Sequence, residues 1–208
     1  MIDPATLITF TGVAVGFVLL PGPAMLLTIT RATSSGTRVG IATGAGIAAG
    51  DMIHTLMAVV GISAIIAASA MLFSIIKYIG AAYLVYLGIG VILKKSLIDL
   101  APQTRPISTG TAFRQAILAE VLNPKTALFF LALLPQFVRP ENGSVMVQLA
   151  VLGILYVLLG FAGTVAFALS AGTLGNFLRR SPKVLKWQNK VVGGIYCLLG
   201  VRLALQDR

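Results

Sequence analysis

The sequence predicts an all-α integral membrane protein with six transmembrane helices, arranged as two inverted repeats of three helices whose first helices are broken. Three observations lead to this class. The chain of 208 residues is 57% hydrophobic and 11% charged, with a mean hydropathy of +0.95. Its apolar runs reach the length of roughly 20 residues that a membrane span needs. Basic residues gather in alternate connecting segments, as membrane orientation requires.

The apolar runs define the predicted spans and the organisation of the chain. A five-span interpretation stays open, because no Asp, Glu, Lys or Arg lies between Asp51 and Lys77, where the second and third spans meet. We expect a single membrane domain over 1–208, with repeat 1 at about 1–95, a cytoplasmic loop at about 95–112 and repeat 2 at about 113–208. The six spans are placed at about 5–30, 39–66, 70–93, 113–137, 146–170 and 187–205.

Lysine and arginine are unevenly distributed between the connecting segments. Eleven of the sixteen basic residues follow the first, third and fifth spans. By the positive-inside rule these segments face the cytoplasm, and both termini then lie outside. A five-span chain would scatter this asymmetry, so the charges favour six spans. The eleven residues are Arg31, Arg38, Lys94, Lys95, Arg105, Arg114, Arg179, Arg180, Lys183, Lys186 and Lys190.

The two halves of the chain resemble each other. A shift of 101 residues places Pro23 over Pro124, each midway along the first span of its half. A shift of 113 residues places "KYIGAAY" (77–83) over "KVVGGIY" (190–196), with lysine, glycine and tyrosine at matching offsets. Three spans in each half then enter the membrane from opposite sides. This is the inverted-topology repeat of many secondary transporters.

Three motifs, taken in order, resemble those of a known family. They are "LLPGPAML" (19–26), "GIATGAGIAAGDMIH" (40–54) and "EVLNPKTALFF" (120–130). With the length and the span pattern they cover nearly the whole chain, which resembles the lysine-exporter and homoserine/threonine-resistance family of bacterial amino-acid exporters. The resemblance implies a multi-pass protein of the bacterial inner membrane that expels amino acids or close analogues, driven by an ion gradient.

The expected function is that of a secondary transporter, an antiporter that exports amino acids and is coupled to the proton gradient. The pathway candidates include one lysine against one deep aspartate, which gives no bias toward cationic substrates. The resemblance implies basic or neutral amino acids as substrates, and without a cationic bias we expect neutral or hydroxylated ones such as homoserine, threonine or leucine. Two alternatives stay open: a passive channel, which could use the same broken helices, and an exporter of other small metabolites or drugs.

The breaks in the first and fourth spans predict a binding site at mid-membrane. Pro21 and Pro23 lack a backbone N–H, so carbonyls of the first span lose helical partners, and Gly22 relieves the crowding. Pro124 acts likewise beside the amide of Asn123. Freed carbonyls suit an ammonium group and half-helix N-termini suit a carboxylate. We predict that these five residues bind substrate, the alternative being plain helix kinks.

Charged side chains at the same depth are further candidates. Lys125 would cost about 2.5–3.5 kcal/mol facing lipid, so it is expected to face a cavity or an acid and to bind substrate. Asp51 is expected to bind substrate and, with His54 one turn further, to carry a proton. The alternatives are a structural Asp51–Lys125 pair and a packed histidine. Glu120 is interpreted either as a vestibule residue or as a solvated acid at a helix end.

Other classes of function find little support. The sequence lacks the glycine-rich loop followed by Lys and Ser or Thr that binds the phosphates of ATP. It also lacks a nucleophile and a base at a spacing typical of a hydrolase, so we expect neither an enzyme nor a cofactor. The single Cys197 gives no metal-ligand pattern. The net charge of +10 reflects the basic loops rather than nucleic-acid binding. The expected partners are a small amino-acid substrate and the lipid bilayer, and homo-oligomer formation stays open.

The first prediction concerns orientation. Reporter fusions placed after residue 208 and within the segment 99–110 should report opposite sides of the membrane, with the segment cytoplasmic, because the basic loops stay inside. A cytoplasmic C-terminus would contradict both the six-span topology and the inverted repeat.

Overall fold

The protein is described by a computed structural model that covers residues 2–19, 22–64, 70–93, 106–180 and 182–205. Over these ranges all regular secondary structure is helical and no strand occurs. An all-α fold is therefore confirmed for the described chain. Asp3 caps the first helix, because its carboxylate accepts hydrogen bonds from the backbone N–H and the hydroxyl of Thr6 at 2.8 and 2.6 Å.

The first half contains a bent helix pair and two further helical segments. The pair consists of α1 (Pro4–Leu19) and α2 (Pro23–Ser35), whose axes differ by 52°. Next comes α3 (Thr37–Met57), which continues as the π-helix η1 (Ala58–Ile62). The helix α5 (Ala70–Leu93) completes this half.

The second half begins with a second bent pair. In it α6 (Thr109–Val121) is followed by α7 (Pro124–Leu128), the π-helix η2 (Phe129–Leu133) and the 3-10 helix η3 (Leu134–Phe137), with a bend of 46°. A short 3-10 turn η4 (Pro140–Asn142) leads to α8 (Val145–Arg180) and then to α9 (Pro182–Leu205). The segment expected to be a loop between the last two spans is thus helical on both sides of residue 181.

Proline explains where both breaks occur. Pro23 is the first residue of α2 and Pro124 is the first residue of α7. Proline is favoured at the first position of a helix, where its missing N–H has no intrahelical role, and it disrupts a helix that would continue through it. Pro21 lies outside the described residues.

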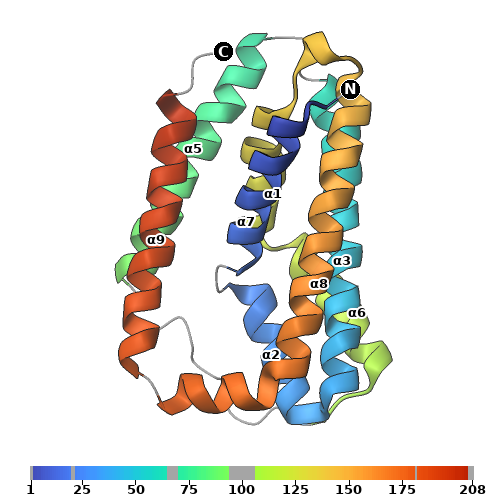
Figure 1. Ribbon diagram of the computed structural model, residues 1–208, viewed down its shortest axis with the longest axis vertical. Coiled ribbons are helices and arrows are strands. Elements are labelled where there is room, and N and C mark those ends of the chain that lie inside the picture. Colours follow the sequence, from blue (N-terminus) through green and yellow to red (C-terminus); the bar gives the residue numbers. More distant parts are fainter. Residues whose placement is uncertain (1, 20–21, 65–69, 94–105, 181, 206–208) are drawn as a thin grey trace.

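Most helical segments run up and down along the long axis of the molecule, whereas the C-terminal part of α8 lies across it (Figure 1). Both termini lie at one end, and the α2–α3 and α8–α9 joins lie at the other. The helix α5 packs along α9, whereas α3 packs between α6 and α8. Since α3 and α5 run in opposite directions, the five-span interpretation finds no support in this arrangement.

Length and composition identify candidate membrane spans. Two segments of the described chain, Thr37–Ile62 and Val145–Thr173, are long and apolar enough to cross a bilayer, and the two bent pairs raise this number to four. The apolar parts of α5 and α9 are shorter, at Lys77–Leu93 and Gly193–Leu205. A membrane protein is consistent with these helices, while the six crossings and the inverted repeat stay predictions.

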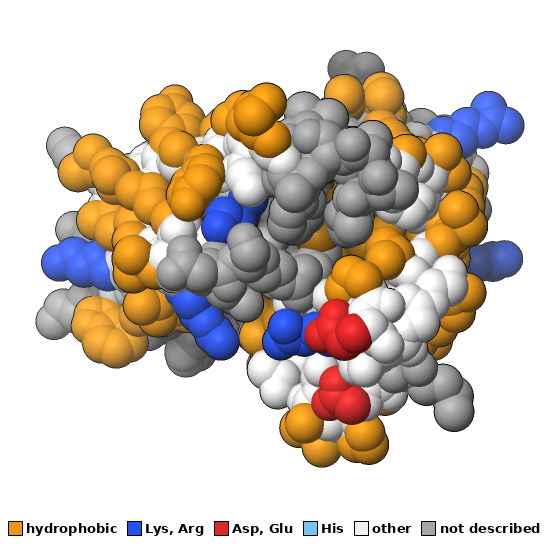
Figure 2. Space-filling view, turned by 90° about the horizontal axis from the view of Figure 1, so that it is seen from above, with side chains coloured by type: hydrophobic (Ala, Val, Ile, Leu, Met, Phe, Trp, Pro, Cys, Tyr) orange, Lys and Arg blue, Asp and Glu red, His pale blue; other side chains and the backbone are white. Residues whose placement is uncertain are grey.

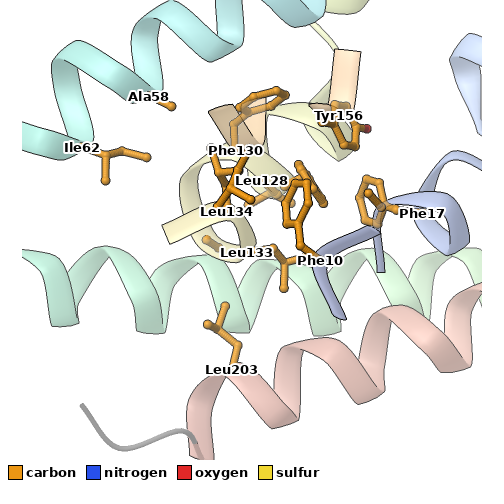
Figure 3. Packing of buried hydrophobic residues seen from close by; sticks show 14 of the residues in the cluster. Phe10, Phe17, Ala58, Ile62, Leu128, Phe130, Leu133, Leu134, Tyr156 and Leu203 are labelled. Carbon is orange, nitrogen blue, oxygen red and sulfur yellow. The ribbon is translucent and has the colours of Figure 1, made fainter. Parts of the chain in front are cut away.

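Aromatic side chains form the centre of the core between the two bent pairs (Figure 3). Phe129 stacks on Tyr156 with ring centroids 4.1 Å apart, and it also contacts Phe10 and Phe17 at 6.0 and 5.0 Å. Aromatic contacts of this kind each add about 0.5–1.5 kcal/mol beyond area burial. The core therefore links α1, η2 and α8 close to the helix breaks.

Glycines let α3 approach its neighbours. A Cβ on Gly50 would lie 2.6 Å from the Cβ of Glu120 on α6, and one on Gly46 would collide with the backbone oxygen of Phe113. Small residues permit such close backbone contact between membrane helices. The lack of side chains at these glycines therefore lets α3 pack closely on α6, and this brings Asp51, the neighbour of Gly50, to the side of α6 that carries Glu120.

Candidate functional site

The break between α1 and α2 leaves a backbone acceptor that Lys125 engages. In a continuous helix the carbonyl of Phe17 would accept from the N–H of residue 21, but that residue is Pro21 and has no N–H. The ammonium of Lys125 donates to this carbonyl at 2.8 Å, and it lies 4.6 Å from the centre of the Phe17 ring. A side chain from the second bent pair thus satisfies the backbone of the first.

The break between α6 and α7 is organised by Asn123 and Glu120. The side-chain oxygen of Asn123 caps α7 by accepting from the N–H of Lys125 at 3.1 Å. Its amide nitrogen donates to both carboxylate oxygens of Glu120, at 3.1 and 3.2 Å. The hydroxyl of Thr126 also donates to Glu120. Glu120 is buried, with 3% of its surface exposed, so these donors replace the water that it has lost.

Asp51 faces this network from α3. Its side chain is also 3% exposed, and it interacts electrostatically with both Glu120 and Lys125. Its Oδ1 atom is buried and has no hydrogen-bond partner among the described residues. Gly160 on α8 leaves room for it, since a Cβ there would lie 3.3 Å from Oδ2. A buried carboxylate oxygen without a donor is costly, and a proton or a ligand donor would satisfy it.

These groups line one small cavity at the two breaks. Its volume is about 40 Å³, enough for a few water molecules and too little for a whole amino acid. The charged side chains in its wall are two acids and one lysine. The lining residues are Val18, Gly22, Ala24, Met25, Ile47, Asp51, Glu120, Asn123, Lys125, Thr126, Tyr156, Gly160, Thr164 and Phe167.

The structure brings together four of the predicted binding residues, Gly22, Asp51, Asn123 and Lys125, in the wall of this cavity. Pro23 and Pro124 start their helices, are exposed and do not line it. Their part in the site is to end the preceding helix rather than to contact the cavity. The roles of all these residues in binding stay predictions.

His54 lies beside the cavity and not in its wall. It is buried, its Nε2 atom is 3.1 Å from the backbone oxygen of Glu120, and its ring stacks on Phe130 with centroids 5.7 Å apart. This environment resembles that of a packed, structural histidine, which was the alternative to a proton carrier in the sequence analysis. Its expected part in carrying protons stays a prediction.

Sequence reasoning left several residues of the site unassigned. Glu120, for which a solvated helix end was one interpretation, is buried at the centre of the network. Its spacing of three residues from Asn123 and six from Thr126 places all three around one break, which is a signal that could have been used. Tyr156 and Gly160 come from the long apolar α8, where no local pattern distinguishes them.

Metal binding finds no support in the described part of the chain. No group of three or more His, Cys, Asp or Glu side chains there could hold a metal ion.

The contact between Asn123 and Glu120 gives a testable prediction. Asn123→Asp keeps the oxygen that caps α7 but places a carboxylate against Glu120 in a buried space, so we expect a loss of stability of about 1–3 kcal/mol. Adding Glu120→Gln should restore most of this loss, because an amide again faces a carboxylate. Thermal unfolding of the purified protein measures the effect, with Glu120→Gln alone as control. Equal stability of Asn123→Asp and the unchanged protein would contradict the network.

Comparisons with known proteins agree with the resemblance noted in the sequence. An uncharacterised membrane protein of Vibrio cholerae is 34% identical over 92% of each chain. A homoserine/homoserine lactone efflux protein of Salmonella typhimurium is 32% identical over 89% of each chain. The membrane protein YrhP of Bacillus subtilis is 30% identical over 96% of this chain and 99% of its own. No solved structure matches the chain.

The family model described as LysE type translocator matches residues 15–207, which include both helix breaks and every residue that lines the cavity. The chain therefore belongs to the LysE type translocator family.

Proposed function

We propose that the protein exports amino acids from the cytoplasm in exchange for protons, and that its substrates are neutral or hydroxylated amino acids. Membership of a translocator family supports transport, and the homoserine/homoserine lactone efflux protein of Salmonella typhimurium supports export of small amino compounds. The observation that carries the proposal is the cavity at the two helix breaks, with its two buried carboxyl groups and one lysine.

Charge balance explains why this cavity would exchange a proton for an amino acid. When Asp51, Glu120 and Lys125 are all ionised, two negative charges face one positive charge, which leaves a net charge of −1 in the wall. An uncompensated charge inside a membrane protein is costly. A proton can neutralise it. A zwitterionic substrate adds no net charge, but its ammonium group can pair with the same carboxyl groups while the first turn of α2 holds its carboxylate. Because the proton and the ammonium group would satisfy the same carboxyl pair, binding of one favours release of the other.

The arrangement also suggests how an amino acid lies in the site. The unpartnered Oδ1 of Asp51 is the acceptor for the substrate ammonium. The first turn of α2 is the donor for the substrate carboxylate, because the cap residue Gly22 has no side chain and because Ala24 and Met25 line the cavity. The corresponding turn of α7 is already capped by Asn123. Once the cavity has widened beyond its present volume of about 40 Å³, a zwitterion would span from α3 to α2.

Export requires the cavity to open on each side in turn. The bent pairs would supply the points of movement, and the close packing of α3 against α6 and α8 would supply a rigid body that can rock about them. Six crossings in two inverted repeats, with both termini outside the inner membrane, would place the cavity at the midplane. The shared end of the two termini is consistent with this topology.

Substitution of the charged wall tests the proposal. In everted vesicles energised by a proton gradient, the unchanged protein should take up homoserine or threonine. Asp51→Asn should reduce this uptake by about tenfold or more, since a hydrogen bond to a charged group contributes roughly 1.5–3 kcal/mol. The double variant Asp51→Asn with Lys125→Met should be present in the membrane and inactive, because the acceptor for the substrate ammonium is gone. Glu141→Gln, an exposed acid near the termini, is the matched control.

Two outcomes would contradict the proposal. Full uptake by a well-folded double variant would mean that Asp51 and Lys125 are only a structural pair. Uptake by the unchanged protein that an uncoupler does not reduce, and that stops at equal concentrations, would indicate a passive channel instead.

A further inference from the structure

A second and larger cavity opens at the end of the molecule that carries both termini. Its volume is about 230 Å³, and it lies between the first turns of α1, the η2–η3 segment and the last turns of α9. It is distinct from the cavity at the helix breaks, since the two share no lining residue. Its wall consists of Ala5, Thr6, Thr9, Val13, Leu133, Gln136, Phe137, Arg139, Leu199, Arg202 and Leu203.

Two arginines give this cavity a positive wall. Arg139 and Arg202 line it, and no acidic residue does. Both are exposed, and neither guanidinium makes a hydrogen bond or an ion pair with a described residue. Figure 2 looks onto this end and shows basic side chains near the middle of the face, one of them beside an acidic side chain. This charge is the reverse of the net negative wall at the helix breaks.

The position of Arg139 is fixed by a buried side chain on α8. Gln148, which is 3% exposed, accepts from the backbone N–H of Arg139 at 3.0 Å and donates to its carbonyl at 2.8 Å. It also donates to the carbonyl of Gly143 at 3.1 Å. The segment that presents the arginine is therefore held by three hydrogen bonds, which favours a preformed site.

An aromatic layer separates the two cavities. Phe137 of the outer cavity contacts Phe10 at 5.2 Å, Phe10 contacts Phe129 at 6.0 Å, and Phe129 stacks on Tyr156, which lines the inner cavity. The outer cavity thus lies on the side of this aromatic layer that faces the end with the termini.

We propose that Arg139 and Arg202 form a second binding site, which holds the carboxylate of a departing substrate on the exit side. Guanidinium groups bind carboxylates through paired, charge-assisted hydrogen bonds. The apolar side chains of Leu133, Phe137 and Leu199 line the same space and suit a short aliphatic substrate side chain. A substrate that has left the inner cavity would thus meet the outer cavity as a separate site for its carboxylate. This inference rests on the proposed direction of export.

Comparison of homoserine with homoserine lactone tests the site, because the lactone is a cyclic ester and has no carboxylate. In proteoliposomes with the exit side facing the bath, homoserine in the bath should inhibit export. The double variant Arg139→Gln with Arg202→Gln should raise its half-inhibitory concentration by about tenfold. Inhibition by the lactone should stay unchanged. Arg114→Gln, an exposed arginine on α6, is the control. Equal shifts for both compounds, or none, would overturn the inference.

A binding measurement keeps the test independent of transport. Butyrate, a carboxylate without an ammonium group, should raise the unfolding temperature of the purified protein and should lose this effect in the double arginine variant. If the unchanged protein transports neither compound, the proposed function fails while this measurement still decides the site. The measurement is repeated with phosphatidylglycerol in place of butyrate. Stabilisation by that lipid alone would assign the arginines to a lipid headgroup and overturn the inference.

Discussion

The hydrogen bond from Lys125 to the backbone of Phe17 is the interaction on which the rest of the site depends. A proline at residue 21 removes the donor that a continuous helix would offer to this carbonyl, and hydrocarbon supplies no substitute. The lysine that replaces it lies on the second bent pair, so the two halves of the chain meet at the point where each is broken. This contact draws a positive charge to mid-molecule, and the carboxyl groups of Asp51 and Glu120 lie in the same cavity wall.

Close packing of α3 against α6 brings the carboxyl groups of Asp51 and Glu120 to one cavity. Because Gly50 has no side chain, α3 approaches α6 until Glu120 lies against the helix that carries Asp51. Glu120 is satisfied by Asn123 and Thr126, whereas Oδ1 of Asp51 lacks a donor among the described residues. The two acids therefore differ in role. One holds the break together, and the other is left for a proton or for the ammonium group that we propose as its ligand.

The sequence predicted the helix breaks, and four of the residues that line the cavity, because proline, asparagine and charged residues in an apolar run have few physical explanations. It could not assign Tyr156 or Gly160, since their place in the wall depends on how α8 packs against distant helices and leaves no local pattern. It also left Glu120 undecided, because an acid near a helix end is compatible with water until the neighbouring helix is placed. The outer cavity joins α1, η3 and α9, which no local pattern connects.

The central claim is that one buried carboxyl pair holds either a proton or the ammonium group of a substrate. Its most direct test is proton movement driven by substrate alone, followed with a pH-sensitive dye in proteoliposomes that begin with no pH difference. An imposed homoserine gradient should drive protons in the direction opposite to homoserine, because each release of one ligand favours binding of the other. Homoserine that runs down its gradient with no movement of protons would contradict the claim.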